Sequence, residues 1–176
     1  MKTKTAKEQF NEIYSSESDA IFRFCLLRTA DRECALDLTQ ETFLRLWNTL
    51  LQEKEIQNHR AFLFTVARNL VIDFYRKKKT LSIEALSEES PNEEFVVLQD
   101  GSEIAQELET EARFLLGKLK ELDPLYQQVV YLRFVEGILP KDIAEILGIS
   151  PNAVSVRISR GIEQLREITG YSQQEE

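Results

Sequence analysis

Apolar residues recur along this 176-residue chain at helical spacing, and no stretch alternates in the manner of a β-strand. The pattern predicts three helices in the first 80 residues. The first begins near Lys7, is broken near 15–16, and carries its apolar positions at Phe10, Ile13, Tyr14, Ile21, Phe22 and Phe24. The second is capped by Asp31 and runs to about Leu51, and the third spans about 60–79.

The C-terminal part resumes the helical pattern near Glu103 and continues it to about Leu122. Asp123 is then expected to cap the start of the next helix, with Pro124 in its first turn. The next helix should end near 136–137, where a glycine stands. These elements predict a second helical domain over 103–169, after a first domain over 7–80.

The segment 139–166 predicts a helix–turn–helix. Gly148 can end the first helix because glycine adopts the left-handed conformation without penalty. Ser150 offers an N-cap hydroxyl and Pro151 suits the first helical position. The buried stripe of the second helix should be Val154, Ile158, Gly161 and Leu165. Its outer face carries Asn152, Val156, Ser159, Arg160 and Glu163, with Ser155 and Arg157 on the flanks. Such a face enters a DNA major groove, whereas an ordinary helical hairpin is the alternative.

The net charge of −8 is unexpected for a chain that binds nucleic acid. The segment 80–112 holds ten Asp or Glu and no Lys or Arg, so the rest of the chain carries about +2. Within it, residues 81–102 show turn and charge signals without a helical stripe and predict an acidic linker. The fold class is therefore all-α, with two small helical domains joined by that linker.

Several classes of protein find no support in the sequence. No apolar run reaches the roughly 20 residues of a membrane span, and no secretory signal is visible. Cys25 and Cys34 match no metal or redox spacing and predict reduced packing residues in a cytoplasmic protein. The single histidine, His59, has no nucleophile, phosphate loop or ligand cluster to join, so neither an enzyme nor a cofactor or metal site is expected.

The third predicted helix combines aromatic and basic residues. Its core stripe should be Leu63, Val66, Leu70 and Phe74. Its outer face would then present Phe64, Arg68, Ile72, Tyr75, Arg76 and Lys79. Aromatic rings that stack on bases, together with cations that hold phosphates, suit single-stranded nucleic acid. A solvated basic helix with spare aromatics at a domain junction is the equal alternative.

The second predicted helix has two distinct faces. Leu36, Phe43, Trp47 and Leu50 fall together and should be core. Asp37, Gln40, Glu41, Leu44 and Asn48 share another face. An exposed leucine among carboxylates and amides indicates a protein interface, although single surface leucines are common.

Four motifs in a fixed order give the whole chain, from Phe10 to about Arg166, a family resemblance. They are DLTQETF at 37–43, ARNLVID at 67–73 with its basic tail, LRFVEG at 132–137 and DIAEILGIS at 142–150. The chain resembles the extracytoplasmic-function (ECF) sigma factors, the small branch of the sigma-70 family of bacterial RNA polymerase subunits. The resemblance implies a region two domain that binds the polymerase clamp and opens the −10 promoter element. It also implies a region four domain that reads the −35 element as duplex.

The resemblance assigns residues to each surface. Core polymerase would be bound by Asp37, Gln40, Glu41, Leu44 and Asn48. The −10 strand would be held by His59, Arg60, Phe64, Arg68, Asn69, Tyr75, Arg76 and Lys77, and the loop 52–59 would capture a flipped base. The −35 duplex would be read by Lys141, Asn152, Ser155, Val156, Arg157, Ser159 and Arg160. The resemblance implies that the acidic linker enters the core enzyme. Shielding of the basic faces by its charge and a plain solvated tether are the alternatives. An anti-sigma factor is a further partner that the resemblance allows.

The chain departs from the family pattern in two places. Ser155 and Val156 stand where many members have Lys-Ser, and Leu139 stands where many have a polar cap. The first departure affects which promoter is read. A free-standing helix–turn–helix regulator would explain the C-terminal third alone and leave the second and third helices without a role.

Overall fold

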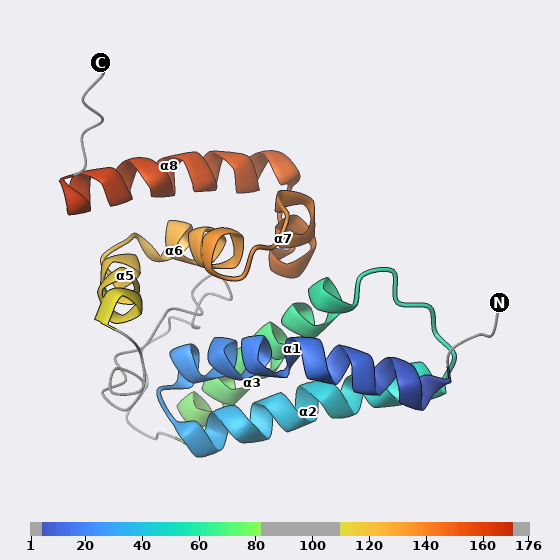
Figure 1. Cartoon of the computed structure of the whole chain (residues 1–176). Coiled ribbons are helices and arrows are strands. Elements are labelled where there is room, and N and C mark those ends of the chain that lie inside the picture. Colours follow the sequence, from blue (N-terminus) through green and yellow to red (C-terminus); the bar gives the residue numbers. More distant parts are fainter. Residues whose placement is uncertain (1–4, 82–109, 171–176) are drawn as a thin grey trace. The chain divides into compact units, whose positions relative to one another are not determined.

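The computed structural model describes residues 5–81 and 110–170, which belong to two compact units, Met1–Ser90 and Pro91–Glu176. Every regular element in these two ranges is helical, as Figure 1 shows. The all-α prediction is therefore confirmed for the described residues. Most of the predicted acidic linker, and the predicted helix before Thr110, lie outside them.

The first unit contains α1 (Ala6–Thr29), α2 (Arg32–Leu51) and α3 (His59–Leu81). In Figure 1, α1 and α2 run antiparallel, joined by a short corner in which Ala30 adopts the left-handed conformation. Asp31 caps α2, because its carboxylate accepts a 2.9 Å bond from the Cys34 N–H. The predicted boundaries of the second and third helices agree with the structure to within two residues.

The predicted break near Ser15 and Ser16 is wrong, because α1 continues through both residues. The Ser16 hydroxyl donates to the Ile13 carbonyl at 3.1 Å, which satisfies it inside the helix. At its start the helix holds a capping box between Thr5 and Glu8. A long uninterrupted α1 gives the other two helices a full-length packing partner.

The core of the first unit corrects the predicted face of α3. Phe64 is fully buried and Ile72 is buried, although both were expected on the outer face. The physical reason is that α3 packs against both α1 and α2, so its buried arc is wider than a single stripe. Phe64 meets the Phe24 ring of α1 edge-on, with the ring centroids 5.3 Å apart.

Leu36 on α2 is also corrected, because it was expected in the core and its side chain is 42% exposed. It lies in the second turn of α2, beside the corner that joins α2 to α1. Phe43 and Leu50 are buried as predicted, and Trp47 is half-buried. The ring of Trp47 packs edge-on against Phe10 of α1, with a centroid distance of 5.4 Å.

The second unit contains α5 (Thr110–Lys120), α6 (Pro124–Val130), the π-helical turn η1 (Tyr131–Val135), α7 (Pro140–Leu147) and α8 (Pro151–Thr169). Asp123 caps α6 as predicted, accepting from the Leu125 N–H at 2.8 Å, with Pro124 at the first position. The π turn is closed by a buried 2.6 Å bond from the Tyr131 hydroxyl to Glu136 Oε1.

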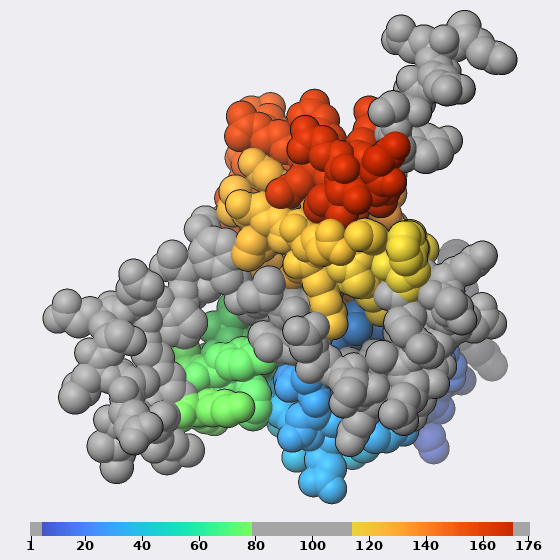
Figure 2. Space-filling model, turned by 90° about the vertical axis from the view of Figure 1, so that its left-hand side faces the viewer, coloured from blue at the N-terminus to red at the C-terminus, as the bar shows by residue number. Residues whose placement is uncertain are grey.

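Helix α8 packs on α6, and Figure 2 shows α8 in red against the yellow and orange α5 and α6. Gly161 of α8 is buried against Val130 and Tyr126, so the two helices approach each other closely there. A bond from the Asp123 N–H to Gln164 Oε1, at 3.0 Å, adds a polar link between the α6 cap and α8. This packing fixes one side of α8 and leaves the other side free for contacts outside the unit.

Candidate nucleic-acid and polymerase interfaces

The turn between α7 and α8 has the geometry that the sequence predicts. Gly148 takes a left-handed φ of 65°, and the Ser150 hydroxyl accepts from the Ala153 N–H at 3.1 Å. Ile143 and Val154 have no exposed surface and hold the two helices together. The structure thus contains a helix–turn–helix whose second helix is the longer of the two.

The outer face of α8 is open to solvent. Its exposed residues are Asn152, Ser155, Val156, Ser159, Arg160 and Glu163. Arg157 is half-buried on the flank, and Lys141 is exposed in the first turn of α7. The Ser155 hydroxyl donates to the Pro151 carbonyl at 3.1 Å, so its hydrogen is already used within the helix. This face is mostly polar and carries a cation, as a DNA-facing surface requires.

The predicted core-binding residues form one surface on α2, which we call the α2 outer face: Asp37, Gln40, Glu41, Leu44 and Asn48. All are exposed except Glu41, which is half-buried and pairs with Arg45 at 2.9 Å. Leu44 is 51% exposed although it is apolar. Leu36 lies four residues, about one turn, before Gln40 on the same side of the helix, so it extends this face. The sequence pattern did not indicate Leu36 as a surface residue, because its spacing with Phe43, Trp47 and Leu50 assigned it to the core.

The residues predicted on α3 do not form one surface. Asn69, Arg76 and Lys77 are exposed, but Phe64 is in the core and cannot stack on a base. Arg60 pairs with Glu17 of α1 at 2.9 Å, so it is engaged within the unit. His59 and Arg68 are half-buried.

Tyr75 is tied to the fold by its hydroxyl, which donates to the Arg28 carbonyl at the end of α1. Burial raises the pKa of Tyr75 above its ordinary value, so the hydroxyl stays protonated and able to donate. The side chain is only half-buried, and its ring edge packs near Phe74. This residue connects α3 to α1 while keeping part of its ring at the surface.

The exposed side of α3 follows a different stripe from the predicted one. It includes the half-buried Phe62 and Val66, the exposed Asn69 and Asp73, and Arg76. These positions repeat at i, i+4, i+7, i+11 and i+14, which places them on one face. The signal that could have revealed it is the pair of small residues Ala61 and Ala67, both of which are buried.

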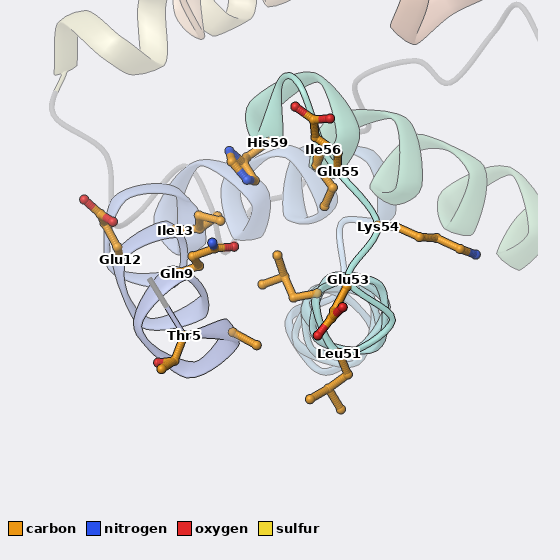
Figure 3. A pocket seen from close by; sticks show the side chains of 12 residues that line it. Thr5, Gln9, Glu12, Ile13, Leu51, Glu53, Lys54, Glu55, Ile56 and His59 are labelled. Atoms are coloured by element: carbon orange, nitrogen blue, oxygen red, sulfur yellow. The ribbon is translucent and has the colours of Figure 1, made fainter. Parts of the chain in front are cut away.

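A cavity of about 1060 Å³ lies at the end of the first unit where α2 stops and α3 starts. Figure 3 shows Gln9 and Ile13 of α1 on one side, with the end of α2 and the loop residue Glu53 on the other. His59 closes it at the start of α3, where Asn58 is the cap and accepts from the Ala61 N–H at 3.0 Å. The lining holds three carboxylates and one lysine: Glu12, Glu53, Glu55 and Lys54.

Within residues 5–81 and 110–170, no group of His, Cys, Asp and Glu side chains could hold a metal ion. In the same ranges, no helix is long and apolar enough to cross a membrane. Both cysteines are free thiols, and burial raises the pKa of Cys25 to about 12. Desolvation also raises the pKa of Cys34, helped by the nearby Asp31 carboxylate. Both thiols are therefore protonated and poorly nucleophilic at neutral pH.

The second unit thus contains a helix–turn–helix with an exposed second helix, and α2 of the first unit carries an exposed face of polar and apolar residues. The family models make the class specific: the Sigma-70 region 2 model matches residues 13–80, and the Sigma-70, region 4 model matches residues 115–165. The chain belongs to the sigma-70 family, in its extracytoplasmic-function branch.

Three relatives illustrate the similarity. ECF RNA polymerase sigma factor BldN of Streptomyces coelicolor is 27% identical over 162 residues, which cover 92% of this chain and 60% of BldN. ECF RNA polymerase sigma factor SigE of Mycolicibacterium smegmatis is 28% identical over 171 residues, covering 93% and 63%. RNA polymerase sigma factor YlaC of Bacillus subtilis is 25% identical over 170 residues and matches 97% of both chains. The chain thus spans less than two thirds of BldN and SigE and nearly all of YlaC.

Two solved structures share the fold. The sigma factor RpoE of Bartonella quintana, crystallised with the anti-sigma factor NepR, matches with a TM-score of 0.67 and 21% identity, covering 94% of this chain and 99% of RpoE. CnrH, in complex with the cytosolic domain of CnrY, matches with a TM-score of 0.62 and 21% identity, covering 93% and 89%.

Proposed function

We propose that this chain is a promoter-specificity subunit that binds core RNA polymerase and directs it to promoter DNA. The observation that carries the proposal is the presence of both sigma-70 regions in one chain, each with an exposed surface of suitable chemistry. A free-standing regulator would use the helix–turn–helix and leave the α2 outer face, with its exposed Leu44, without a partner. The chain itself catalyses no reaction in this role and acts in the cytoplasm, where polymerase and promoter meet.

Each surface has a proposed task. The α2 outer face docks on the polymerase clamp, with Leu44 and Leu36 supplying apolar contact and Gln40 supplying hydrogen bonds. The outer face of α8 enters the major groove of the −35 element, where Arg160 contacts phosphate. An anti-sigma factor would restrain the free protein by covering one of these surfaces.

The −10 strand is proposed to run along the exposed side of α3, past Asn69, Arg76 and Lys77. The cavity beside loop 52–58 is proposed to take a base flipped out of the duplex. The Glu53 carboxylate can accept hydrogen bonds from an exocyclic amine, which adenine, cytosine and guanine carry and thymine lacks. Phe64 has no part in this proposal, because its ring is buried.

Co-elution with core polymerase tests the proposal. The chain is mixed with purified bacterial core enzyme and separated by size, and the fractions are tested for binding to promoter DNA. We expect a stoichiometric complex that binds promoter DNA tightly while core alone does not. A chain that binds specific DNA by itself and never co-elutes with core enzyme would instead be a free-standing regulator.

A further inference from the structure

The outer face of α8 contains one apolar residue, Val156, among polar ones. Its side chain is 41% exposed, while Val154, two residues earlier, has no exposed surface. Two residues turn a helix by about 200°, so Val156 points away from the packing of the unit. Valine also has a lower helix propensity than alanine at an exposed position. Neither core packing nor helix propensity accounts for this residue.

The neighbours of Val156 place it in the middle of the face that would meet DNA. Asn152 lies one turn before it and Ser159 one turn after it, and both are exposed. The Ser155 hydroxyl donates to the Pro151 carbonyl, so it has no hydrogen left to give to a base. Val156 is therefore the exposed apolar side chain of this face between Asn152 and Ser159.

The chemistry of the major groove restricts what a valine can meet there. The major-groove edges of guanine, adenine and cytosine carry acceptors and amino donors but no methyl group, whereas thymine presents its C5 methyl group. A valine set against a polar edge would leave that edge without its hydrogen bonds, which costs free energy. Against thymine the valine methyls and the C5 methyl exclude water from each other.

We propose that Val156 is a specificity-determining residue that reads the C5 methyl of a thymine in the −35 duplex. The inference rests on the proposed function, because it requires α8 to lie in the major groove of promoter DNA. It names the base contacted at this position. The alternative is that Val156 contacts a protein surface, such as that of polymerase. The experiment below distinguishes a protein contact from a thymine contact.

The test uses the full chain bound to core polymerase. Duplexes are selected from a library with a randomised −35 region, and each thymine of the selected element is then replaced by deoxyuridine, which lacks only the methyl group. We expect one replacement to weaken binding by about fourfold, the effect of one buried methyl group. In Val156→Ala the same replacement should change binding by less than about twofold.

A matched control is Val135→Ala, because Val135 is 42% exposed in the same unit but lies in η1, outside α8. This variant should keep the full response to deoxyuridine. The inference is overturned if the selected element contains no thymine, if wild type ignores every replacement, or if Val156→Ala responds like wild type. Failure of the complex to select any duplex would instead refute the proposed function.

Discussion

Arg28 shows how a charged residue becomes part of the core at the end of α1. It is only 2% exposed, and its guanidinium lies 3.6 Å above the centre of the Phe24 ring. One nitrogen donates to the Phe24 carbonyl at 3.0 Å, close to the negative end of the helix dipole. Its own carbonyl accepts from Tyr75 of α3. Arg28 therefore links the end of α1 to α3 through its backbone carbonyl, while its side chain packs back on α1.

Gly161 allows a close approach between α8 and α6. An added Cβ would lie 2.5 Å from Val130 Cγ2 and 3.2 Å from Tyr126 Cβ. Gly161→Ala should therefore lower the free energy of unfolding of the second unit by about 1–3 kcal/mol, since overpacking outweighs the gain in helix propensity. Denaturant unfolding followed by circular dichroism measures this change.

Gly117→Ala is the matched control, because a Cβ there meets nothing within 4 Å in α5. It should raise stability by up to about 1 kcal/mol. Equal effects of the two substitutions would mean that α6 and α8 do not pack as closely as the structure shows.

The thiol of Cys25 should respond to pH through the stability of the first unit. Its pKa is about 12 in the folded chain and near 9 when unfolded, so the unfolded state loses its proton first as pH rises. The stability that this thiol contributes is complete below pH 9 and falls by about 1.4 kcal/mol per pH unit above it.

Cys25→Ala should remove this part of the alkaline slope. Comparison with the wild-type chain separates the contribution of Cys25 to this slope from that of Tyr75, whose pKa is also raised by burial. Denaturation curves between pH 8 and 11 give the two slopes, and identical slopes would show that the Cys25 thiol is not desolvated.

At the scale of elements, α2 divides its surface between the core and the α2 outer face. Thr39 and Thr42 are buried, and the hydroxyl of each donates a 2.7 Å hydrogen bond to a backbone carbonyl of α2. Neither hydroxyl therefore needs a partner outside the helix. The opposite side keeps Gln40 and Leu44 exposed. We expect Gln40→Ala with Leu44→Ala to weaken binding to core polymerase by about 30-fold or more, with helical content unchanged.

Lys7→Ala with Asn11→Ala is a suitable control, because both residues are exposed on α1. This pair should bind core enzyme like wild type in a pull-down titration. If the α2 pair also binds normally, the clamp contact lies elsewhere.

The loop between α2 and α3 gives a prediction about the −10 element. Glu53→Gln with Glu55→Gln keeps size but removes two carboxylates from the cavity lining. We expect a changed base preference at one −10 position, because a carboxylate only accepts hydrogen bonds whereas an amide also donates. Transcripts from a library randomised in both elements measure this, and the unchanged −35 preference is the internal control. An identical −10 preference would make the loop only a connector.

Helix boundaries were predictable because their signals are local. Asp31, Asp123, Gly148 and Ser150 act on the backbone within one turn, and each does so as predicted. The buried face of α3 was not predictable from one stripe, because two neighbouring helices cover it. The predicted exposure of Phe64 and the predicted burial of Leu36 were wrong for related reasons. Burial depends on which helix lies opposite, and spacing alone does not contain that information.

For the whole molecule, the distribution of charge reconciles a net charge of −8 with DNA binding. Ten carboxylates lie in the segment 80–112, and the remainder carries about +2. The proposed DNA-facing residues Arg76, Lys77 and Arg160 lie outside that segment. Repulsion from the acidic segment fades over a Debye length of about 8 Å at physiological salt. Two exposed surfaces with different chemistry on one chain are what a subunit that bridges polymerase and promoter requires.

Transcription in vitro tests this account most directly. The chain is added to core RNA polymerase with a library of DNA templates, and the transcripts and their upstream sequences are determined. We expect transcripts only when chain and core are both present, from templates that share two elements at a fixed spacing. Transcription that is unchanged by the chain, or enriched templates with a single element bound without core enzyme, would contradict it.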